Sequence, residues 1–299
     1  MKAMITDIKP MAIHDGPGIR TTVFFKGCGL KCLWCHNPET ISAAAQLAFY
    51  ENKCRHCLAC TDICAAHKAI AGQHIFDRDS CRRCSKCVSC CLHGALQLFG
   101  TEMTVETLLP RLLEDRAFYD TTGGGVTLSG GECLLQADFC AALLAALKQE
   151  GIHTAVDTCG FVPRKALEKV LPYTDIFLVD IKAIDPQVHK ACTGQENSVI
   201  LDNIRYLDSV GANIEFRIPF VPGCNDKEIP AIRDFLKTLK GTYPVKVLPY
   251  HNYAGSKYAA LGMENTLPPA LPTDAQVAEA EETIQNGFMR SAMTPPGMA

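Results

Sequence analysis

The stretch GCGLKCLWCHNPET, residues 27–40, decides the fold of this chain, because it places Cys28, Cys32 and Cys35 at C-x3-C-x2-C spacing. A cubane [4Fe–4S] cluster is usually held by four cysteine thiolates. Three local thiolates would leave one iron open for a ligand that the protein does not supply. An open iron on a redox cluster indicates catalysis rather than electron storage. The alternative interpretations are a zinc knuckle and three unrelated loop thiols.

The composition of the chain excludes several classes of protein. Its 299 residues carry a formal net charge of −3, and the isoelectric point is about 6.3. No basic patch dominates, which argues against a nucleic-acid partner. There is no apolar run of about 18 residues, so we expect no membrane-spanning helix. The N-terminal residues MKAMITDIKPM lack the apolar region of a signal peptide.

The number of cysteines bears on the cellular compartment. Seventeen cysteines could indicate a secreted scaffold built on disulfides. However, they cluster at the spacing of metal ligands, and the chain is much longer than the usual disulfide mini-domain. We therefore expect a reducing, cytoplasmic environment, and exposed iron–sulfur clusters indicate an anaerobic organism.

A cysteine-dense block over residues 48–100 contains an internal repeat. The runs CRHCLACTDIC, from Cys54, and CRRCSKCVSCC, from Cys81, each contain the spacing C-x2-C-x2-C-x3-C, and equivalent cysteines lie 27 residues apart. This spacing is typical of bacterial two-cluster ferredoxins, although the proline that usually follows the fourth cysteine is missing in both halves. The alternative is a pair of structural zinc sites.

In the ferredoxin pattern, the fourth cysteine of each run binds the other cluster. One predicted [4Fe–4S] cluster is therefore bound by Cys54, Cys57, Cys60 and Cys91, and the other by Cys81, Cys84, Cys87 and Cys64. Cys90 is an additional thiol beside Cys91, and the spacing selects Cys91. With the cluster of the first motif, the sequence predicts three [4Fe–4S] clusters.

Outside this block, predicted strands alternate with predicted helices. The strands are expected over residues 21–25, 126–130, 153–158, 175–182, 213–220 and 245–250. A helix capped by Thr104, with a kink or break at Pro110, and an amphipathic helix over 137–150 are also expected. Such alternation implies parallel strands with right-handed crossovers. We therefore expect a partial (β/α) barrel over residues 1–47 and 101–299, interrupted by a ferredoxin-like insert over 48–100.

Functional residues of such a barrel gather where its parallel strands end. In the stretch 129–132, Gly130 and Gly131 let a ligand approach the backbone, and Glu132 can accept hydrogen bonds from an ammonium group. Asp15 lies earlier, in a DGPG turn before the first predicted strand. The other strand-end candidates are Asp157, Thr158, Asp180, Ile181, Lys182, Arg217 and His251. Ordinary turns, a rim ion pair and a structural histidine are the alternatives.

In combination, these motifs resemble a known family. The C-x3-C-aromatic-x-C motif, with Trp34 and His36, is similar to that of the radical S-adenosylmethionine (SAM) superfamily. The preceding segment HDGPGIRTTVFFKGC, residues 14–28, resembles the glycyl-radical-enzyme activating enzymes within that superfamily. Further matches lie at Gly130, Asp157, Asp180 and His251, so that the resemblance spans residues 5–260.

The resemblance implies a partial (β/α)6 barrel of the TIM type and a role for each matching residue. Gly130, Gly131 and Glu132 would bind the SAM amino group, with Asp157 on the same side, and Lys182 would meet the carboxylate. Asp157, Thr158 and Asp180 would also hold a monovalent cation. His251 would lie near the ribose and Trp34 beside the cluster, with His36, Ile181 and Arg217 as further contacts. The segment around Asp15 would receive a peptide loop of the partner.

The implied activity is that of an activating enzyme for a glycyl radical enzyme. Such an enzyme reductively cleaves SAM to a 5′-deoxyadenosyl radical, which removes a hydrogen atom from a backbone glycine of its partner. We assign direct participation to Cys28, Cys32, Cys35, Lys182 and Asp15. The two-cluster insert resembles that of activases for dehydratases, lyases and decarboxylases. We expect a monomer that receives electrons from a flavodoxin or ferredoxin. The two insert clusters would either relay these electrons or form a docking surface for the partner, and the sequence does not decide between the two.

Three other functions are compatible with parts of the sequence. A radical SAM enzyme could act on a small molecule, although the DGPG segment and the insert disfavour this. An electron-transfer protein would use all its clusters to relay charge, and SAM would then leave its paramagnetic resonance signal unchanged. In a zinc-structured interaction protein, the cysteines would hold no iron.

Overall fold

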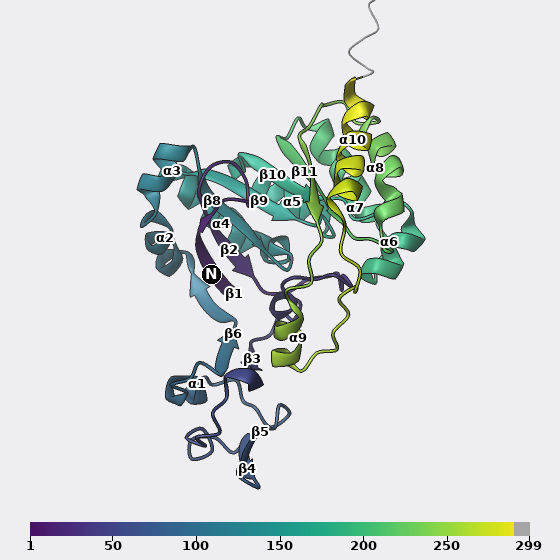
Figure 1. Ribbon diagram of the computed structural model, residues 1–299. Helices are drawn as coiled ribbons and strands as arrows, with labels where there is room; N and C mark the ends of the chain where they lie inside the picture. The colour runs from purple at the N-terminus through teal and green to yellow at the C-terminus, as the bar shows by residue number, and fades with distance from the viewer. Residues whose placement is uncertain (290–299) are drawn as a thin grey trace, which may run out of the picture.

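The computed structural model describes residues 1–289, and residues 290–299, the end of the predicted barrel range, lie outside this part. Its centre is a sheet in which six neighbouring strands run parallel (Figure 1). In spatial order these are β12 (Val245–Pro249), β11 (Ile214–Phe220), β10 (Ile176–Asp180), β9 (His153–Thr158), β8 (Gly125–Gly130) and β2 (Arg20–Phe25). All six strands expected from the sequence are therefore present.

Two antiparallel strands extend the sheet beyond β2. β1 (Lys2–Ala12) pairs with β2, and β7 (Thr101–Thr104) pairs with β1 at the sheet edge. The sequence did not predict β1, and the expectation that the DGPG turn precedes the first strand is wrong. That turn instead joins β1 to β2. β1 was not predicted because most of its side chains are exposed or half-buried, so that its sequence lacks the apolar pattern of a core strand.

Helices cover the outer face of the parallel strands, where the main hydrophobic core lies (Figure 1). They are α2 (Val105–Leu113), α3 (Arg116–Thr122), α4 (Ala137–Gln149), α5 (Arg164–Val170), α6 (Pro186–Thr193), α7 (Ser198–Ser209), α8 (Ile229–Leu236) and α10 (Asp274–Met289). In α4 the predicted apolar face is buried, including Phe139, Leu143 and Leu147. None of the helices in residues 1–289 is both long enough and apolar enough to span a membrane.

Helix α2 starts as expected but does not end at its proline. Thr104 forms a reciprocal capping box with Thr107, which satisfies free backbone groups of the first turn. The helix then continues through Pro110 to Leu113, and the break falls before Asp115 instead. Of the expected kink or break at Pro110, the break is therefore excluded. Leu108 and Leu112, on either side of Pro110, are fully buried, and this packing holds the helix together.

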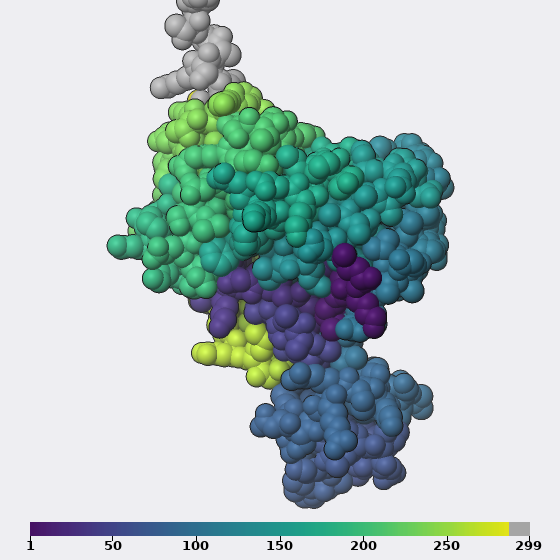
Figure 2. Space-filling model, turned by 180° about the vertical axis from the view of Figure 1, so that it is seen from behind, coloured from purple at the N-terminus to yellow at the C-terminus, as the bar shows by residue number. Residues whose placement is uncertain are grey.

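The cysteine-rich block forms a separate lobe that projects from the barrel (Figures 1 and 2). It contains two antiparallel strand pairs and one short helix, α1 (Lys86–Cys90). The pair β3 (Gln46–Phe49) and β6 (Leu96–Phe99) joins the lobe to the barrel, and the hairpin of β4 (His67–Ile70) and β5 (Gln73–Phe76) lies at the far end.

The 27-residue sequence repeat is also a repeat of backbone conformation. His56 and Arg83 both have positive φ, 52° and 55°, and their backbone N–H groups donate to Cys54 Sγ and Cys81 Sγ at 3.4 Å in each case. Another repeated pair with positive φ, both at 60°, is Leu58 and Ser85. Non-glycine residues rarely adopt this conformation. Its recurrence at the same offset shows that the two halves of the lobe are built alike.

The lobe is fixed to the barrel through helix α9 (Gly255–Leu261). Arg78 donates one hydrogen bond to the Leu47 carbonyl, at 3.2 Å, and another to the Ala260 carbonyl, at 2.8 Å. Ala48 and Phe99 of the lobe pack against Ala260 and Leu261 in a small buried cluster. This contact sets where the lobe stands relative to the barrel.

The DGPG turn packs directly on the start of β8. A Cβ atom added to Gly124 would lie 1.8 Å from the Ile19 carbonyl oxygen, and one added to Gly18 would lie 2.5 Å from the Gly124 nitrogen. Both glycines are required because two backbone segments meet without room for a side chain.

We predict that Gly124→Ala lowers the free energy of unfolding by roughly 1–3 kcal/mol, because backbone atoms must move to admit the methyl group. Urea unfolding followed by circular dichroism measures this change. Gly255→Ala is the control, since its Cβ would meet no protein atom closer than 3.6 Å. Equal stability of the two variants would contradict the close packing at Gly124.

Candidate active site

A large cavity opens at the carboxyl ends of the parallel strands. It encloses about 950 Å³ of empty space, part of it open to solvent. Cys28, Cys32 and Cys35 line it. The ends of β8, β9 and β10 also line it, with Ser129, Gly130, Gly131, Asp157, Thr158, Asp180 and Lys182. The structure thus brings the cysteine motif and most of the predicted strand-end residues to one cavity.

The loop that carries the three cysteines is irregular and is held by bonds to distant parts of the chain. Backbone N–H groups of Lys31 and Leu33 donate to the carbonyls of Thr193 and Cys192, at 2.8 and 2.9 Å. The hydroxyl of Tyr258, in α9, donates to the Cys35 carbonyl at 3.1 Å. The loop is therefore clamped between the end of α6 and helix α9.

The three motif thiols do not form a compact site for a single small ion. A tetrahedral zinc ion with bonds of about 2.3 Å would hold its sulfur ligands about 3.8 Å apart. Among residues 1–289, the group of three whose donor atoms all lie within 4.8 Å of one another is Cys60, His67 and His74, and the motif thiols do not meet this limit. At least two of the motif sulfurs therefore lie farther apart than 4.8 Å.

Burial leaves two of these thiols, Cys32 and Cys35, in need of a metal partner to become thiolates. It raises the pKa of Cys32 to about 11 and that of Cys35 to about 12, and in Cys35 the neighbouring Cys32 adds to the effect. Metal coordination deprotonates a thiol outright. Lys182 acts in the opposite direction on Cys32, because its positive charge favours the thiolate.

The strand ends present charges to the same cavity. The ammonium of Lys182 lies 2.7 Å from Asp180, and its side chain is nearly buried. Burial alone would lower the pKa of Lys182, but Asp180 and the nearby thiols raise it above its ordinary value, so the ammonium stays charged. Asp157 accepts a hydrogen bond from the Ser129 hydroxyl at 2.6 Å. The cavity therefore presents both a positive and a negative group, which is what a zwitterionic ligand requires.

Glu132 is placed differently from the sequence-based expectation. Its side chain is 0 % exposed and does not line the cavity. One carboxylate oxygen accepts from Thr158 Oγ1 at 2.8 Å and from the Cys159 backbone N–H at 2.9 Å, and the other accepts from the Leu134 N–H at 3.1 Å. Glu132 therefore ties the end of β8 to the end of β9, while Gly130 and Gly131 form the surface that a ligand would touch.

Cys159 is a cavity residue that the sequence did not single out. Its sulfur lies within hydrogen-bonding reach of both the Glu132 carboxylate, at 3.0 Å, and Cys28, and its contact with Cys28 lowers the pKa of that thiol. The only sequence signal was its position directly after a predicted strand.

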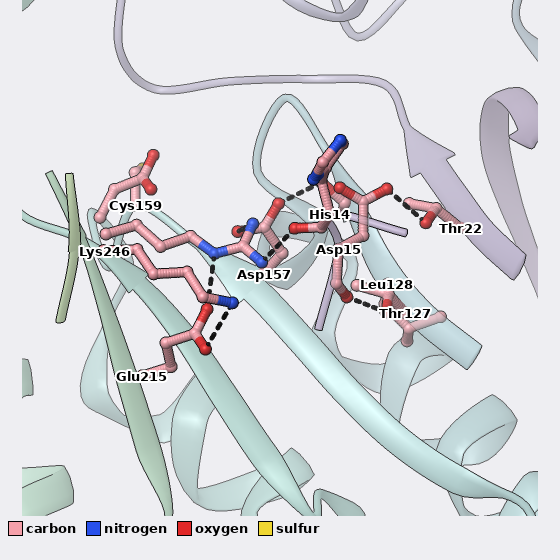
Figure 3. A network of polar contacts seen from close by, with 12 residues as sticks. His14, Asp15, Thr22, Thr127, Leu128, Asp157, Cys159, Glu215 and Lys246 are labelled. Atoms are coloured by element: carbon pink, nitrogen blue, oxygen red, sulfur yellow. Dashed lines mark hydrogen bonds and ion pairs between the residues drawn. The ribbon is translucent and has the colours of Figure 1, made fainter. Parts of the chain in front are cut away.

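Arg217 is the buried centre of a polar network, and Figure 3 shows its partners His14, Asp157 and Glu215. It donates to the His14 carbonyl at 2.7 Å and to Glu215 at 3.4 Å, and lies 3.8 Å from Asp157. The half-exposed Lys246 forms an ion pair with Glu215 at 2.9 Å. Arg217 is 5 % exposed and does not line the cavity, so it connects the DGPG turn to the strand ends.

Asp15 also lies outside the cavity lining, in the turn above this network (Figure 3). Its carboxylate accepts from the Thr22 hydroxyl at 2.6 Å, and its carbonyl accepts from the Thr127 hydroxyl, also at 2.6 Å. Arg20 is fully buried below it and donates to the Pro17 carbonyl at 3.1 Å. The turn is therefore a rigid rim next to the cavity.

The aromatic candidates are stacked along the other rim. The His36 ring lies 3.9 Å from that of His251 at an angle of 11°, and His36 Nε2 bonds the His251 carbonyl at 2.7 Å. His36 and Trp34 line the cavity, whereas His251 lies behind His36. Nδ1 of His251 is buried without a hydrogen-bond partner. Ile181 is buried in the main core, so only its backbone could meet a ligand.

The lobe thiols form two groups whose members come from both halves of the repeat. Burial raises the pKa of Cys60 to about 11, and the nearby Cys90, Cys54 and Cys57 contribute. Burial also raises the pKa of Cys87 to about 11, with contributions from Cys64 and Cys81. Both Cys90 and Cys91 line a small cavity with the first group. Each group of thiols thus contains at least one cysteine from the other half of the repeat.

Comparisons with known proteins agree with this site. The model of the radical SAM superfamily matches residues 22–236. The trans-4-hydroxy-L-proline dehydratase activating enzyme of Clostridioides difficile is 44 % identical over 266 residues, covering 86 % of this chain and 87 % of that protein. The choline trimethylamine-lyase activating enzyme of Oleidesulfovibrio alaskensis is 40 % identical over 304 residues and 95 % of each chain.

A solved structure supports the fold alone. SuiB of Streptococcus suis, bound to the precursor peptide SuiA, superposes with a TM-score of 0.51 and 13 % identity, over 89 % of this chain and 44 % of that one.

We predict that Arg217→Met lowers the free energy of unfolding by about 3 kcal/mol, because it leaves the Asp157 carboxylate near the end of β9 without its cation. Lys246→Met, which removes a half-exposed partner of Glu215, should cost less than about 1 kcal/mol. Urea titration of both variants measures the difference. Equal, small losses would show that the buried network does not hold this side of the barrel together.

Proposed function

Because the chain belongs to the radical SAM superfamily, and within it to the activating enzymes of glycyl radical enzymes, we propose that it generates the backbone glycyl radical of a partner enzyme. The partner is of the dehydratase, lyase or decarboxylase type, since these are the enzymes named for its relatives. When bound, the [4Fe–4S] cluster and SAM supply a 5′-deoxyadenosyl radical that removes the glycine hydrogen atom.

One observation carries the proposal: the three motif thiols and the charged strand ends line one and the same cavity. Cys28, Cys32 and Cys35 would hold the cluster, and they leave one iron free of protein ligands. The amino-acid end of SAM carries one positive and one negative charge. In the cavity, Asp157 and Asp180 would face the positive ammonium group of SAM, and Lys182 would face its negative carboxylate. Gly130 and Gly131 let the amino-acid end of SAM approach the backbone.

The rest of the cavity suits the adenosine part of SAM. Trp34, Val221 and Tyr250 supply apolar surface, and the stacked His36 and His251 limit its width. In this proposal Glu132, Arg217 and His251 are positioning residues, because they act through the backbone and the side chains that they hold. The protein itself transfers no proton in the hydrogen abstraction.

A monovalent cation near Asp157, Thr158 and Asp180 is part of the proposal. Both carboxylates already have a cationic neighbour, Arg217 for Asp157 and Lys182 for Asp180. A bound cation would let Lys182 turn from Asp180 to the SAM carboxylate without leaving Asp180 unpaired. Oxygen ligands of this kind suit a hard cation.

For the lobe we propose a ferredoxin-like domain over residues 48–100 that holds two further [4Fe–4S] clusters. One is bound by Cys54, Cys57, Cys60 and Cys91, and the other by Cys81, Cys84, Cys87 and Cys64. Cys91 is chosen over Cys90 because the Cys90 thiol already donates to the Cys87 carbonyl, at 3.2 Å. These clusters would pass electrons from a flavodoxin or ferredoxin to the barrel of a monomeric enzyme.

The reaction can be tested with a partner enzyme that contains deuterated glycine. Anaerobically reconstituted protein is mixed with the partner, SAM and dithionite. We expect the electron paramagnetic resonance signal of a glycyl radical, a doublet with unlabelled partner that collapses to a single line with the deuterated one, and deuterium in the released 5′-deoxyadenosine. Turnover of a small metabolite, without radical or deuterium transfer, would contradict the proposal.

Cysteine variants should separate the two kinds of cluster. Cys32→Ala removes a ligand from the cavity cluster and should abolish SAM cleavage. Cys57→Ala, in the lobe, should leave SAM binding intact but slow reduction of the cavity cluster. Release of 5′-deoxyadenosine measures the first effect, and freeze-quenched resonance spectra measure the second. Loss of SAM binding in Cys57→Ala would show that the two sites are not separate.

A variant of the DGPG turn should uncouple the two half-reactions. Asp15→Ala should spare SAM cleavage but reduce the yield of glycyl radical, because Asp15 lies beside the cavity and not in its lining. Thr22→Val removes the bond to the Asp15 carboxylate while keeping its charge, and serves as the control. Equal loss of cleavage and radical yield in Asp15→Ala would mean that the turn supports SAM and not the partner.

A further inference from the structure

The hairpin of β4 and β5 places two buried histidines against one group of lobe thiols. Nδ1 of His67 lies 2.8 Å from Nε2 of His74, and Nδ1 of His74 lies 3.8 Å from Cys54 Sγ. The Cys60 sulfur and one nitrogen of each histidine lie within 4.8 Å of one another. His67 and His74 are 2 % and 5 % exposed. Neither residue belongs to the cysteine pattern or to the cavity in the barrel.

The contacts select one arrangement of protons along this pair. If His67 Nδ1 donates to His74 Nε2, then His74 Nδ1 carries its proton and points it at Cys54. The remaining atom, His67 Nε2, is buried without a partner, and in this arrangement it needs no acceptor. The reverse arrangement would bury an unpaired N–H at His67 and turn a lone pair of His74 toward a negative thiolate. The first arrangement is therefore favoured.

The internal repeat offers a comparison within the same lobe. Both halves give their first cysteine a backbone N–H at 3.4 Å, from His56 to Cys54 and from Arg83 to Cys81. In the second half, however, the positions equivalent to His67 and His74, 27 residues further along the chain, are occupied by Gly94 and Thr101. The second half has no counterpart of the histidine pair. The pair is thus a difference between two groups of thiols that are otherwise built alike.

We propose that His74, oriented by His67, hydrogen-bonds the Cys54 thiolate and makes the cluster of the first group the first lobe cluster to be reduced. This inference rests on the two-cluster lobe of the proposed function. Hydrogen bonds to cluster sulfurs help to set the reduction potential, and they raise it because they stabilise the added negative charge. One electron from the donor enters the cluster, and no bond is formed or broken.

Redox titration can test this order in a variant that lacks the cavity cluster. Cys28, Cys32 and Cys35 are replaced by alanine in the full chain, and the reduced clusters are followed by paramagnetic resonance. We expect about eight iron atoms per chain and two separate midpoint potentials. Adding His74→Phe should move the higher midpoint to a more negative value and leave the lower one unchanged. His74→Asn keeps an N–H near the position of Nδ1 and should restore most of the shift.

A second measurement detects the histidine directly in the unsubstituted protein and uses His74→Phe only to assign the signal. In protein labelled with ¹⁵N-histidine, the cluster that is reduced first should show a nitrogen coupling in electron spin-echo spectra, and His74→Phe should remove it. The inference is overturned if that cluster lacks the coupling, if both midpoints move together, or if one mononuclear metal occupies Cys60, His67 and His74. Fewer than about eight iron atoms in the unsubstituted lobe would instead refute the two-cluster proposal on which it rests.

Discussion

The activity of this protein depends on holding three thiols in place on a loop that has no regular secondary structure. Such a loop cannot fix its own shape, because its backbone groups have no ladder of partners. Here the partners come from elsewhere: the end of α6 supplies carbonyls, and α9 supplies the hydroxyl of Tyr258 and the ammonium of Lys257. Lys257 bonds the His36 carbonyl at 3.1 Å and the Glu39 carboxylate at 2.6 Å. The thiol geometry is thus a property of the whole barrel.

Helix α9 also connects the two parts of the molecule. Tyr258 of α9 donates a hydrogen bond to the cysteine loop. The same helix accepts a hydrogen bond from Arg78 of the lobe and packs against β3 and β6, the first and last strands of the lobe. A lobe that delivers electrons must keep a fixed distance from the cluster that receives them. A single short helix in contact with both provides this constraint, although it belongs to neither the cysteine motif nor the repeat.

The sequence predicted the parts of the fold that follow from local pattern. Six parallel strands and the gathering of Asp157, Asp180 and Lys182 follow from strand–helix alternation, because parallel strands end on one side of a sheet. It could not predict that the Glu132 carboxylate turns inward, since that depends on bonds to the next strand. Nor could it join His67 to His74, because only the short hairpin between them brings their rings together.

The central claim is that the motif thiols leave one iron free to bind the amino-acid end of SAM. Electron–nuclear double resonance on the reduced, reconstituted protein tests it directly, with SAM labelled by ¹⁷O in the carboxylate and ¹⁵N in the amino group. The account predicts couplings from both labels to the reduced cavity cluster. A spectrum that does not change on addition of SAM would contradict it.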